Sequence, residues 1–287
     1  MSLPVTAACL MCHFNRYMKK AQALDDGPKT LEFGKALMRM YLDAPEGVSS
    51  PWYSPQVAEL FQKYYGLGDN QYEEEKRLAN RFVMERFDQM QTMVSKAADP
   101  VFAGLQLAIL GNYLDFAALQ GAVSFEKMEQ MLTEAMHMEL DQQVYGQLKK
   151  DLQGAKKLLY LTDNAGEIVF DRVFAEELQK KFPDLQITFC VRGGPAANDA
   201  TREDAAVAGI PFPIIDNGTC IAGTVPELIS EEARIALEQS DVIISKGQGN
   251  CETLYGSPYN IYFAFLVKCS RFIDKFNRPK FTPMLTK

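Results

Sequence analysis

The sequence predicts an α/β protein in which an all-helical N-terminal region precedes a doubly wound, mainly parallel sheet with helices on both faces. In the first half of the chain, apolar residues recur every three or four positions, which is the period of amphipathic helices. In the second half, short apolar runs alternate with helical segments, which indicates βα units. Right-handed crossovers would then cover both faces of the sheet. We predict a helical domain over residues 1–152 and an α/β domain over residues 153–287.

The N-terminal region contains several separate helical patterns and no predicted strand before residue 155. The predicted helices are residues 30–41, 54–65, 71–95, one that begins at Asp99–Pro100, and one capped by Ser124. Ser54 followed by Pro55 is typical of a helix start, because serine caps the free N–H groups and proline fits the first helical position.

Four buried strands are predicted in the second half. They are residues 158–161, 185–191, 212–216 and 241–245, and the intervening helices are residues 167–181, 198–208, 230–239 and one from about residue 251. Each strand is a continuous apolar run, as expected when both faces of a sheet are covered. The last segment, from Ser270 to Lys287, is compatible with a helix or an edge strand.

Composition excludes several classes of protein. The chain has 287 residues, of which 47% are apolar and 23% charged, so it can form a large core. Its net charge of -7 argues against a nucleic-acid partner, although it does not exclude an anionic small molecule. The apolar segment from Val101 to Val123 contains polar residues, so we expect a buried helix and no membrane partner. Six cysteines and no recognisable secretory signal predict a cytoplasmic protein.

Polar turns follow three of the predicted strands. The turns are "DNAGE" at Asp163 to Glu167, "RGGPAAND" at Arg192 to Asp199, and "SKGQGNCE" at Ser245 to Glu252. The carboxyl ends of parallel strands lie along one edge of a sheet, and ligands bind there. We therefore expect these three turns to meet in space and to form one site.

The residue types in these turns suit a metal ion and a phosphate. Asp163, Asn164 and Asp199 offer hard oxygen ligands for Mg²⁺ or Mn²⁺. The helix that opens at Gly166 could direct free N–H groups at an anion, and Gly247 would allow close backbone approach. Lys246 adds a positive charge that could hold a phosphate oxygen.

Each of these residues also has a purely structural interpretation. Asp163, Asn164 and Asp199 could cap the helices that follow them, and the glycines could serve turns alone. Asn112 and Asp115 lie three apart in an otherwise apolar helix, so they share a face. They could line a polar pocket or satisfy each other between helices.

Together, "AILGNYLDF", "LTDNAGE", "RGGPAAND" and "SKGQGNCE" resemble the damage-control phosphatase family, also known as domain of unknown function 89. The resemblance implies metal-dependent hydrolysis of phosphate monoesters of small metabolites, such as sugar phosphates or phosphopantetheine-like compounds. It implies Mn²⁺, Mg²⁺, Co²⁺ or Ni²⁺ as the cofactor, held by Asp163, Asn164 and Asp199. It also implies that Lys246 holds the phosphate and that Asn112 and Asp115 lie at the pocket wall.

The expected mechanism is displacement at phosphorus assisted by the metal. The candidate catalytic residues are Asp163, Asp199 and Glu167, and Gly166, Gly247 and Asn250 join Lys246 as candidates for phosphate or substrate binding. The nucleophile is expected to be water or, as an alternative, Asp163 itself. Against the alternative, the D-x-D pattern of aspartyl-phosphate chemistry is missing, because Ala165 stands two residues after Asp163.

Three cysteines form a possible thiol site. Cys9 and Cys12 make one C-x-x-C pair, and Cys269 follows far along the chain, a pattern that resembles the prokaryotic branch of the family. With His13, the three thiols could bind a second metal or act in redox chemistry. Because a structural zinc usually needs four ligands and no second C-x-x-C exists, these cysteines could instead be structurally neutral.

Two other functions remain open from the sequence. Glycines after the strands suggest a nucleotide or S-adenosylmethionine binder, for example a carboxyl methyltransferase, but no G-x-G-x-x-G stands at the first strand–helix turn. A non-enzymatic helical interaction protein is the other alternative. The sequence predicts no particular metabolite and no oligomeric state.

Overall fold

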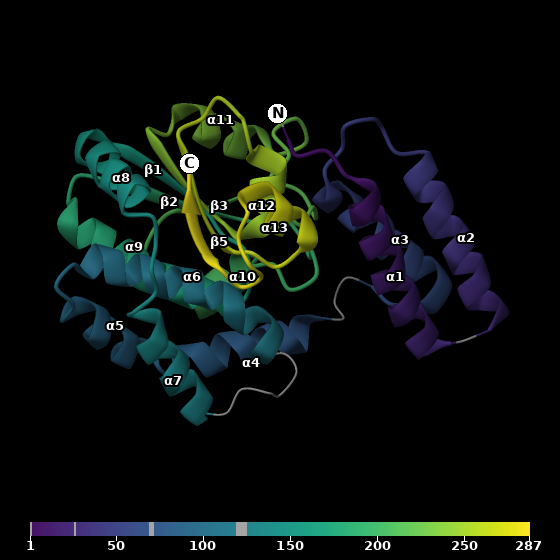
Figure 1. Ribbon diagram of the computed structural model, residues 1–287, viewed down its shortest axis with the longest axis horizontal. Helices are drawn as coiled ribbons and strands as arrows, with labels where there is room; N and C mark the ends of the chain where they lie inside the picture. The colour runs from purple at the N-terminus through teal and green to yellow at the C-terminus, as the bar shows by residue number, and fades with distance from the viewer. Residues whose placement is uncertain (1, 26, 69–71, 119–124) are drawn as a thin grey trace.

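A six-stranded sheet forms the centre of the C-terminal half, with strand order β3-β2-β1-β4-β5-β6 (Figure 1). The computed structural model describes residues 2–25, 27–68, 72–118 and 125–287, with side chains described except at 113–118 and 125–129. The strands are β1 Lys157–Leu161, β2 Gln186–Val191, β3 Ile214–Asp216, β4 Val242–Lys246, β5 Ile261–Leu266 and β6 Pro283–Thr286. The first five are parallel, and β6 pairs antiparallel with β5 at one edge. This arrangement confirms the predicted α/β class and mainly parallel sheet.

Successive side chains of each strand enter two different cores, as the pleat of a strand requires. Leu158 and Tyr160 of β1 pack with α6 (Pro100–Ala118), α8 (Gln142–Gly154) and α9 (Glu167–Lys181) on one face. Leu159 and Leu161 pack on the other face, with α11 (Glu231–Gln239), α12 (Gly247–Leu254) and α13 (Ser270–Phe276). Helices therefore cover both faces, as predicted for a doubly wound sheet.

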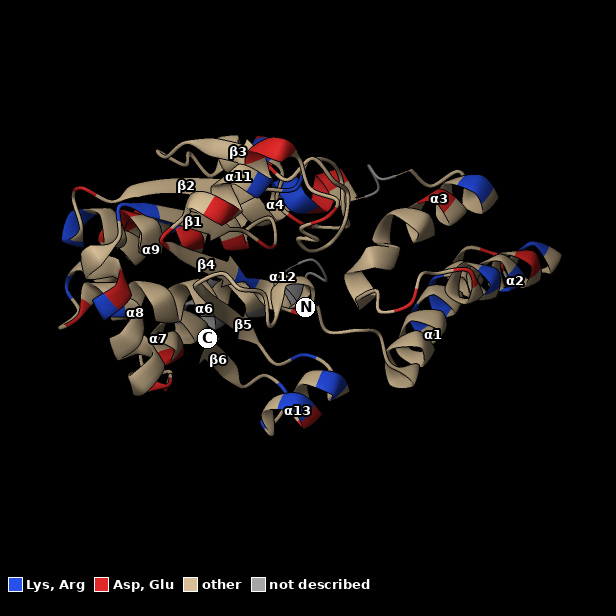
Figure 2. Cartoon of the chain, turned by 90° about the horizontal axis from the view of Figure 1, so that it is seen from above, with Lys and Arg blue, Asp and Glu red and all other residues tan. Residues whose placement is uncertain are grey.

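The helices of the first half fall into two groups. α1 (Ala7–Leu24), α2 (Pro28–Leu42), the 3-10 helix η1 (Ser50–Tyr53) and α3 (Ser54–Tyr65) share a core of their own, and they lie to one side of the sheet (Figures 1 and 2). α4 (Glu73–Met84), α5 (Phe87–Ser95), α6 and α7 (Phe125–Ala135) contribute instead to a core with α9. Two hydrophobic cores thus contain side chains from both sides of residue 152. The domain boundary that we placed at this residue stays a prediction.

Several elements differ from the prediction. The segment 71–95 forms two helices, because Arg86 between them has non-helical backbone angles. The helix expected over 198–208 is the shorter α10 (Arg202–Val207), which starts after a capping box between Thr201 and Asp204. α12 starts at Gly247 rather than near residue 251. β5 was not predicted, and the ambiguous last segment forms both α13 and β6.

Among the described residues, no helix combines the length and the apolar character that crossing a bilayer would require.

Candidate active site

The predicted polar turns lie at the carboxyl ends of the central strands. β1 and β4 are neighbours, yet the chain leaves β1 towards β2 on one side and leaves β4 towards β5 on the other. Ligands of open parallel sheets bind at such a reversal of strand order. Asp163 stands two residues after β1, and Lys246 is the last residue of β4.

Two amides hold the acidic groups of the first turn together. Asn164 Nδ2 donates to Asp163 Oδ2 at 2.7 Å and to Glu167 Oε2 at 2.9 Å. Asn112 Nδ2, from α6, donates to the same two oxygens at 2.8 and 3.0 Å. The first-half residue Asn112 is therefore part of this cluster. The side chain of Asp115 lies outside the described residues.

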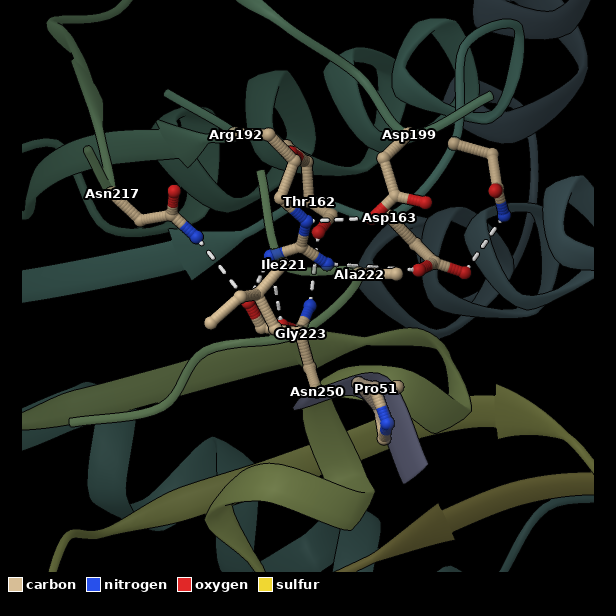
Figure 3. Close-up of polar contacts among 12 residues, drawn as sticks. Pro51, Thr162, Asp163, Arg192, Asp199, Asn217, Ile221, Ala222, Gly223 and Asn250 are labelled. Atoms are coloured by element: carbon tan, nitrogen blue, oxygen red, sulfur yellow. Dashed lines mark hydrogen bonds and ion pairs between the residues drawn. The ribbon is translucent and has the colours of Figure 1, made fainter. Parts of the chain in front are cut away.

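Backbone contacts bring the second turn against the first. Asn164 and Asp199 form an antiparallel bridge, in which Ala200 N donates to the carbonyl oxygen of Asp163 at 2.7 Å. This pairing places the two predicted metal-binding aspartates on adjoining loops, as Figure 3 shows. Because α10 starts only at Arg202, Asp199 lies before the helix and pairs with Asn164 in this bridge.

Arg192 connects the second turn to both neighbouring loops, and sequence reasoning did not single it out. Its Nε donates to Asp199 Oδ2 at 2.6 Å, and its Nη1 donates to Asn250 Oδ1 at 3.0 Å (Figure 3). Its Nη2 lies 3.9 Å from Asp163 Oδ1 and has no hydrogen-bond partner among the described residues. The side chain is 2% exposed. An arginine directly after a buried strand was the available signal, because a buried charge requires a partner.

Gly247 gives Asp163 the space that it occupies. Gly247 has a φ of +76°, and a Cβ placed on it would lie 2.1 Å from Cγ of Asp163. Gly166 also has a positive φ, of +77°, but its N–H donates to Asn80 Oδ1 at 2.6 Å. The N–H that was predicted to receive a phosphate at Gly166 therefore already has a protein partner.

Lys246 is fully buried beneath the cluster. Its Nζ donates to Glu167 Oε1 and Asp171 Oδ1, both at 2.7 Å, and to the carbonyl oxygen of Ala108 at 2.8 Å. An ammonium group has three N–H donors, so these contacts use all of them. A direct contact with a phosphate, as predicted, would require one of these bonds to break. Lys246 in this structure holds Glu167 in place.

Asn250 is also fully buried, and its side chain connects the ends of three strands at the site through hydrogen bonds. Its Nδ2 donates to the carbonyl oxygens of Thr162 at 2.9 Å and Lys246 at 2.8 Å, while its Oδ1 accepts from Arg192. It thus joins the ends of β1, β2 and β4. Its contacts place it behind the cluster rather than at an open surface.

The carboxylates around Asp163 give this cluster an excess of negative charge. Burial, followed by the nearby carboxylates of Glu167 and Asp199, holds the pKa of Asp163 well above its ordinary value. For Glu167, burial also acts to raise the pKa, but the Lys246 ammonium, the hydrogen bond from Asn112 and the charge of Lys268 together lower it. At Asp163, the positive charges of Lys268 and Arg192 act in the opposite direction but do not outweigh burial and the nearby carboxylates, and a divalent cation would supply the further positive charge.

The donor set fits a hard cation but not a soft one. Among the described residues, no three histidine, cysteine, aspartate or glutamate side chains are grouped to bind a metal. A cation here would need the amide oxygen of Asn164 besides the two aspartates, and waters for its remaining positions. Such all-oxygen shells suit Mg²⁺ and Mn²⁺.

The predicted thiol residues make their hydrogen bonds to groups other than Asp163, Asn164 and Asp199. All six cysteines are free thiols, and Cys12 is exposed. Cys9 Sγ accepts from Thr6 Oγ1 at 3.2 Å, whereas Cys269 Sγ accepts from Gln248 Nε2 at 3.4 Å. Burial and, to a smaller extent, the charges of Glu252 and Cys9 raise the pKa of Cys269. His13 bonds to Ser50 and not to a thiol.

Comparisons with known proteins find similar sequences over most of the chain. A family model described as a damage-control phosphatase ARMT1-like domain matches residues 5–280. A damage-control phosphatase of Archaeoglobus fulgidus is 32% identical over 276 residues, which is 93% of each chain. One of Pyrococcus horikoshii is 33% identical over 180 residues, or 61% of each chain. An uncharacterised protein of Methanocaldococcus jannaschii is 31% identical over 280 residues, 93% of this chain and 90% of that one.

The fold is also similar to a solved structure over its whole length. The crystal structure of a DUF89 family protein from Pyrococcus horikoshii superposes with a TM-score of 0.83, covers 99% of both chains and is 27% identical. Family model, relatives and structure agree, and the chain belongs to the damage-control phosphatase ARMT1-like family.

Proposed function

We propose that the protein is a metal-dependent phosphatase that hydrolyses phosphate monoesters of small metabolites, such as sugar phosphates or phosphopantetheine-like compounds. The observation that carries this proposal is the meeting of Asp163, Asn164 and Asp199 at the carboxyl edge of the sheet, beside Nη2 of Arg192, which makes no hydrogen bond to any residue that the structure describes. Membership of a family whose relatives are named damage-control phosphatases supports it.

Asp163, Asn164 and Asp199 would hold the cation, which we propose to be Mn²⁺, Mg²⁺, Co²⁺ or Ni²⁺. When bound, such an ion polarises the phosphoryl group and lowers the pKa of a water molecule. Asn112 and Asn164 orient Asp163, because both amides donate to its Oδ2. Glu167 orients these amides in turn, and Lys246 fixes Glu167 from below.

Arg192 is the residue that we propose for contact with the phosphoryl group. Its Nε is held by Asp199, so the guanidinium cannot swing away, and its Nη2 is left to donate towards the Asp163 side of the site. A fixed donor of this kind stabilises charge that develops on a phosphoryl oxygen without needing to reorganise.

We propose water rather than Asp163 as the nucleophile. Asp163 Oδ2 is held by two amides, which leaves this oxygen poorly placed to attack phosphorus. The second aspartate of aspartyl-phosphate chemistry has no counterpart, since Ala165 occupies that position.

A chromogenic phosphate monoester, assayed with each of the four metals and with EDTA, tests the proposal. We expect turnover that depends on added metal and that EDTA removes. Silence with every metal would favour a non-enzymatic role, and tight binding of S-adenosylmethionine without metal binding, seen by calorimetry, would favour the methyltransferase alternative. We also propose a cytoplasmic location, which the six free thiols support.

A further inference from the structure

A cleft of about 220 Å³ lies where the N-terminal helices meet the loops of the active site. Its walls come from α1, from η1 and α3, and from the loops before Asp199 and after β3. Pockets for drug-sized ligands usually hold about 300–1,000 Å³, so this cleft suits a smaller group. None of its residues was a candidate for substrate binding from sequence.

The cleft and the acidic cluster share two loops. Ala196 lines the cleft, and its carbonyl oxygen accepts from the N–H of Asp199 at 3.0 Å. Ala222 also lines the cleft, and the carbonyl oxygen of the next residue, Gly223, accepts from Arg192 Nη1 at 3.2 Å. Pro51 from η1 also lines the cleft, and a Cβ placed on Gly223 would lie 3.2 Å from Pro51 Cβ. Figure 3 labels both residues together with Arg192 and Asp199. A substrate with its phosphate at the acidic cluster would have its remainder close to this cleft.

One face of α1 supplies the charge of the cleft. His13, Arg16, Tyr17 and Lys20 all line it, and their spacing of three, four and seven residues places them on one side of the helix. Arg16 and Lys20 are like charges four residues apart, an arrangement that mildly destabilises a helix unless an anion lies nearby. Lys20 Nζ donates to the hydroxyl of Tyr72 at 3.0 Å, which fixes the ammonium at the cleft wall.

The other titratable groups of the cleft do not cancel this charge. Glu252 lines the cleft, but burial raises its pKa to about 7, so it is only partly ionised at neutral pH, and Arg271 lies 3.5 Å from its Oε2. His13 bonds to Ser50 at 2.8 Å, and burial, followed by the charge of Arg16, lowers its pKa to about 4. His13 is therefore neutral at pH 7 and offers a hydrogen bond rather than a charge.

We propose that this cleft binds the alcohol part of the phosphate ester, and that Arg16 and Lys20 select substrates with a second anionic group remote from the scissile bond. The inference rests on the proposed phosphatase function. The second group is a carboxylate or a phosphate, since guanidinium and ammonium groups bind both.

A matched series of synthetic esters tests the proposal. Alkyl phosphates of three to six carbons would end in a hydroxyl, a carboxylate or a second phosphate, and kcat/KM would be measured for each with metal-loaded protein. We expect the best anionic ester to exceed the hydroxyl ester of equal length at least tenfold, mainly through KM. Comparing kcat/KM for the carboxylate and the phosphate esters shows which of the two anionic groups the cleft prefers.

Variants assign the selectivity to its residues. In the double variant Arg16→Ala/Lys20→Ala, kcat/KM for the anionic ester should exceed that for the hydroxyl ester by less than about twofold. Lys19→Ala, which removes one positive charge from an exposed position of α1 that does not line the cleft, should keep the wild-type ratio. Thermal unfolding of each variant checks that the fold is kept.

Two outcomes would overturn the inference while the proposed function stands. Wild-type protein could hydrolyse hydroxyl and anionic esters equally well, or the double variant could keep the wild-type preference. If the wild type hydrolyses no ester with any metal, the proposed function itself fails, and the inference fails with it.

Discussion

The carboxyl group of Asp163 lies against the backbone of Gly247, so closely that a Cβ at position 247 would be 2.1 Å from its Cγ and Oδ2. These residues belong to different βα turns, one after β1 and one after β4. The contact fixes where Asp163 stands in the crevice between these strands. A glycine is required at this position by the φ of +76° and by the space that Asp163 takes.

Gly247→Ala should therefore displace Asp163 and abolish metal-dependent turnover. The added methyl group cannot be accommodated by moving a flexible chain end, because two amides hold the carboxylate. Positive φ adds strain of about 1 kcal/mol or more. Metal titration and kcat/KM measure the effect. Gly154→Ala is the control, since a Cβ there meets nothing within 4 Å, and it should leave both quantities unchanged.

Arg192→Lys should lower both stability and activity although it keeps the charge. A single ammonium cannot replace the guanidinium bonds to Asp199, Asn250 and the carbonyl of Gly223, so we expect a loss of about 2–3 kcal/mol in the free energy of unfolding. Urea denaturation measures this loss. Arg202→Lys, at the half-exposed pair with Asp216, should cost less than about 1 kcal/mol. Wild-type turnover by Arg192→Lys would exclude a role for Arg192 in phosphate binding.

Lys246→Met tests whether Lys246 acts by holding Glu167. The change leaves Glu167 and Asp171 buried without their cation, and breaking a buried pair in this way costs about 3–5 kcal/mol. The loss should be largest at neutral pH and smaller in acid, where the carboxylates take up protons. Adding Asp171→Asn to Lys246→Met should recover part of the stability. Lys149→Met, at the exposed pair with Asp99, should cost less than about 1 kcal/mol.

Glu252 should make the protein less stable as the pH rises. Burial, partly opposed by Arg271, raises the pKa of this carboxyl from 4.5 to about 7. Below pH 4.5 the group is protonated in both states. Between pH 4.5 and 7 the unfolded chain releases the proton while the folded protein keeps it, so folding loses up to about 3 kcal/mol, and above pH 7 the loss is complete.

Glu252→Gln should remove this dependence. Its free energy of unfolding, compared with that of the wild type, should rise between pH 4.5 and 7 in urea titrations. Arg271 stays charged at every pH in this range. The loss of its partner Glu252 therefore changes the free energy of unfolding by the same amount at each pH and does not alter its pH dependence. Glu203→Gln, at an exposed position, should run parallel to the wild type. A parallel curve for Glu252→Gln as well would show that Glu252 titrates normally.

Local sequence patterns predicted the parallel sheet well because β1 to β4 are short apolar runs between strong helix signals. β5 was not predicted from the sequence, because its apolar run, "IYFAFL", follows α12 after only a few residues. A short continuous apolar run also does not distinguish a buried strand from a buried helix. The edge strand β6 contains Pro283, which the edge position tolerates.

The polar turns could be placed at one edge from sequence, because parallel strands impose it. The partners of Lys246 could not be predicted from the sequence, since they depend on how α9 packs over β4. Glu167 and Asp171 lie four residues apart on one face of α9, and this spacing was a sequence signal for a buried cation between them. Arg192 was similarly hidden, because two of its acceptors, Gly223 and Asn250, lie far along the chain, in the loop after β3 and in α12.

Replacing the proposed metal ligands should stop the reaction. Asp163→Ala and Asp199→Ala should each reduce metal-dependent turnover to background, with the chromogenic ester and saturating Mn²⁺ as the assay. Asp199→Ala also removes the partner of the buried Arg192, so unfolding should be measured alongside. If either variant kept wild-type activity, the proposed metal ligands would be wrong.

Anomalous diffraction from crystals soaked in Mn²⁺ tests the central claim most directly. We predict one strong peak between the side-chain oxygens of Asp163, Asn164 and Asp199, and its loss in crystals of Asp163→Ala. A peak at another position, such as beside Cys9 and Cys269, or no peak at saturating Mn²⁺, would contradict it.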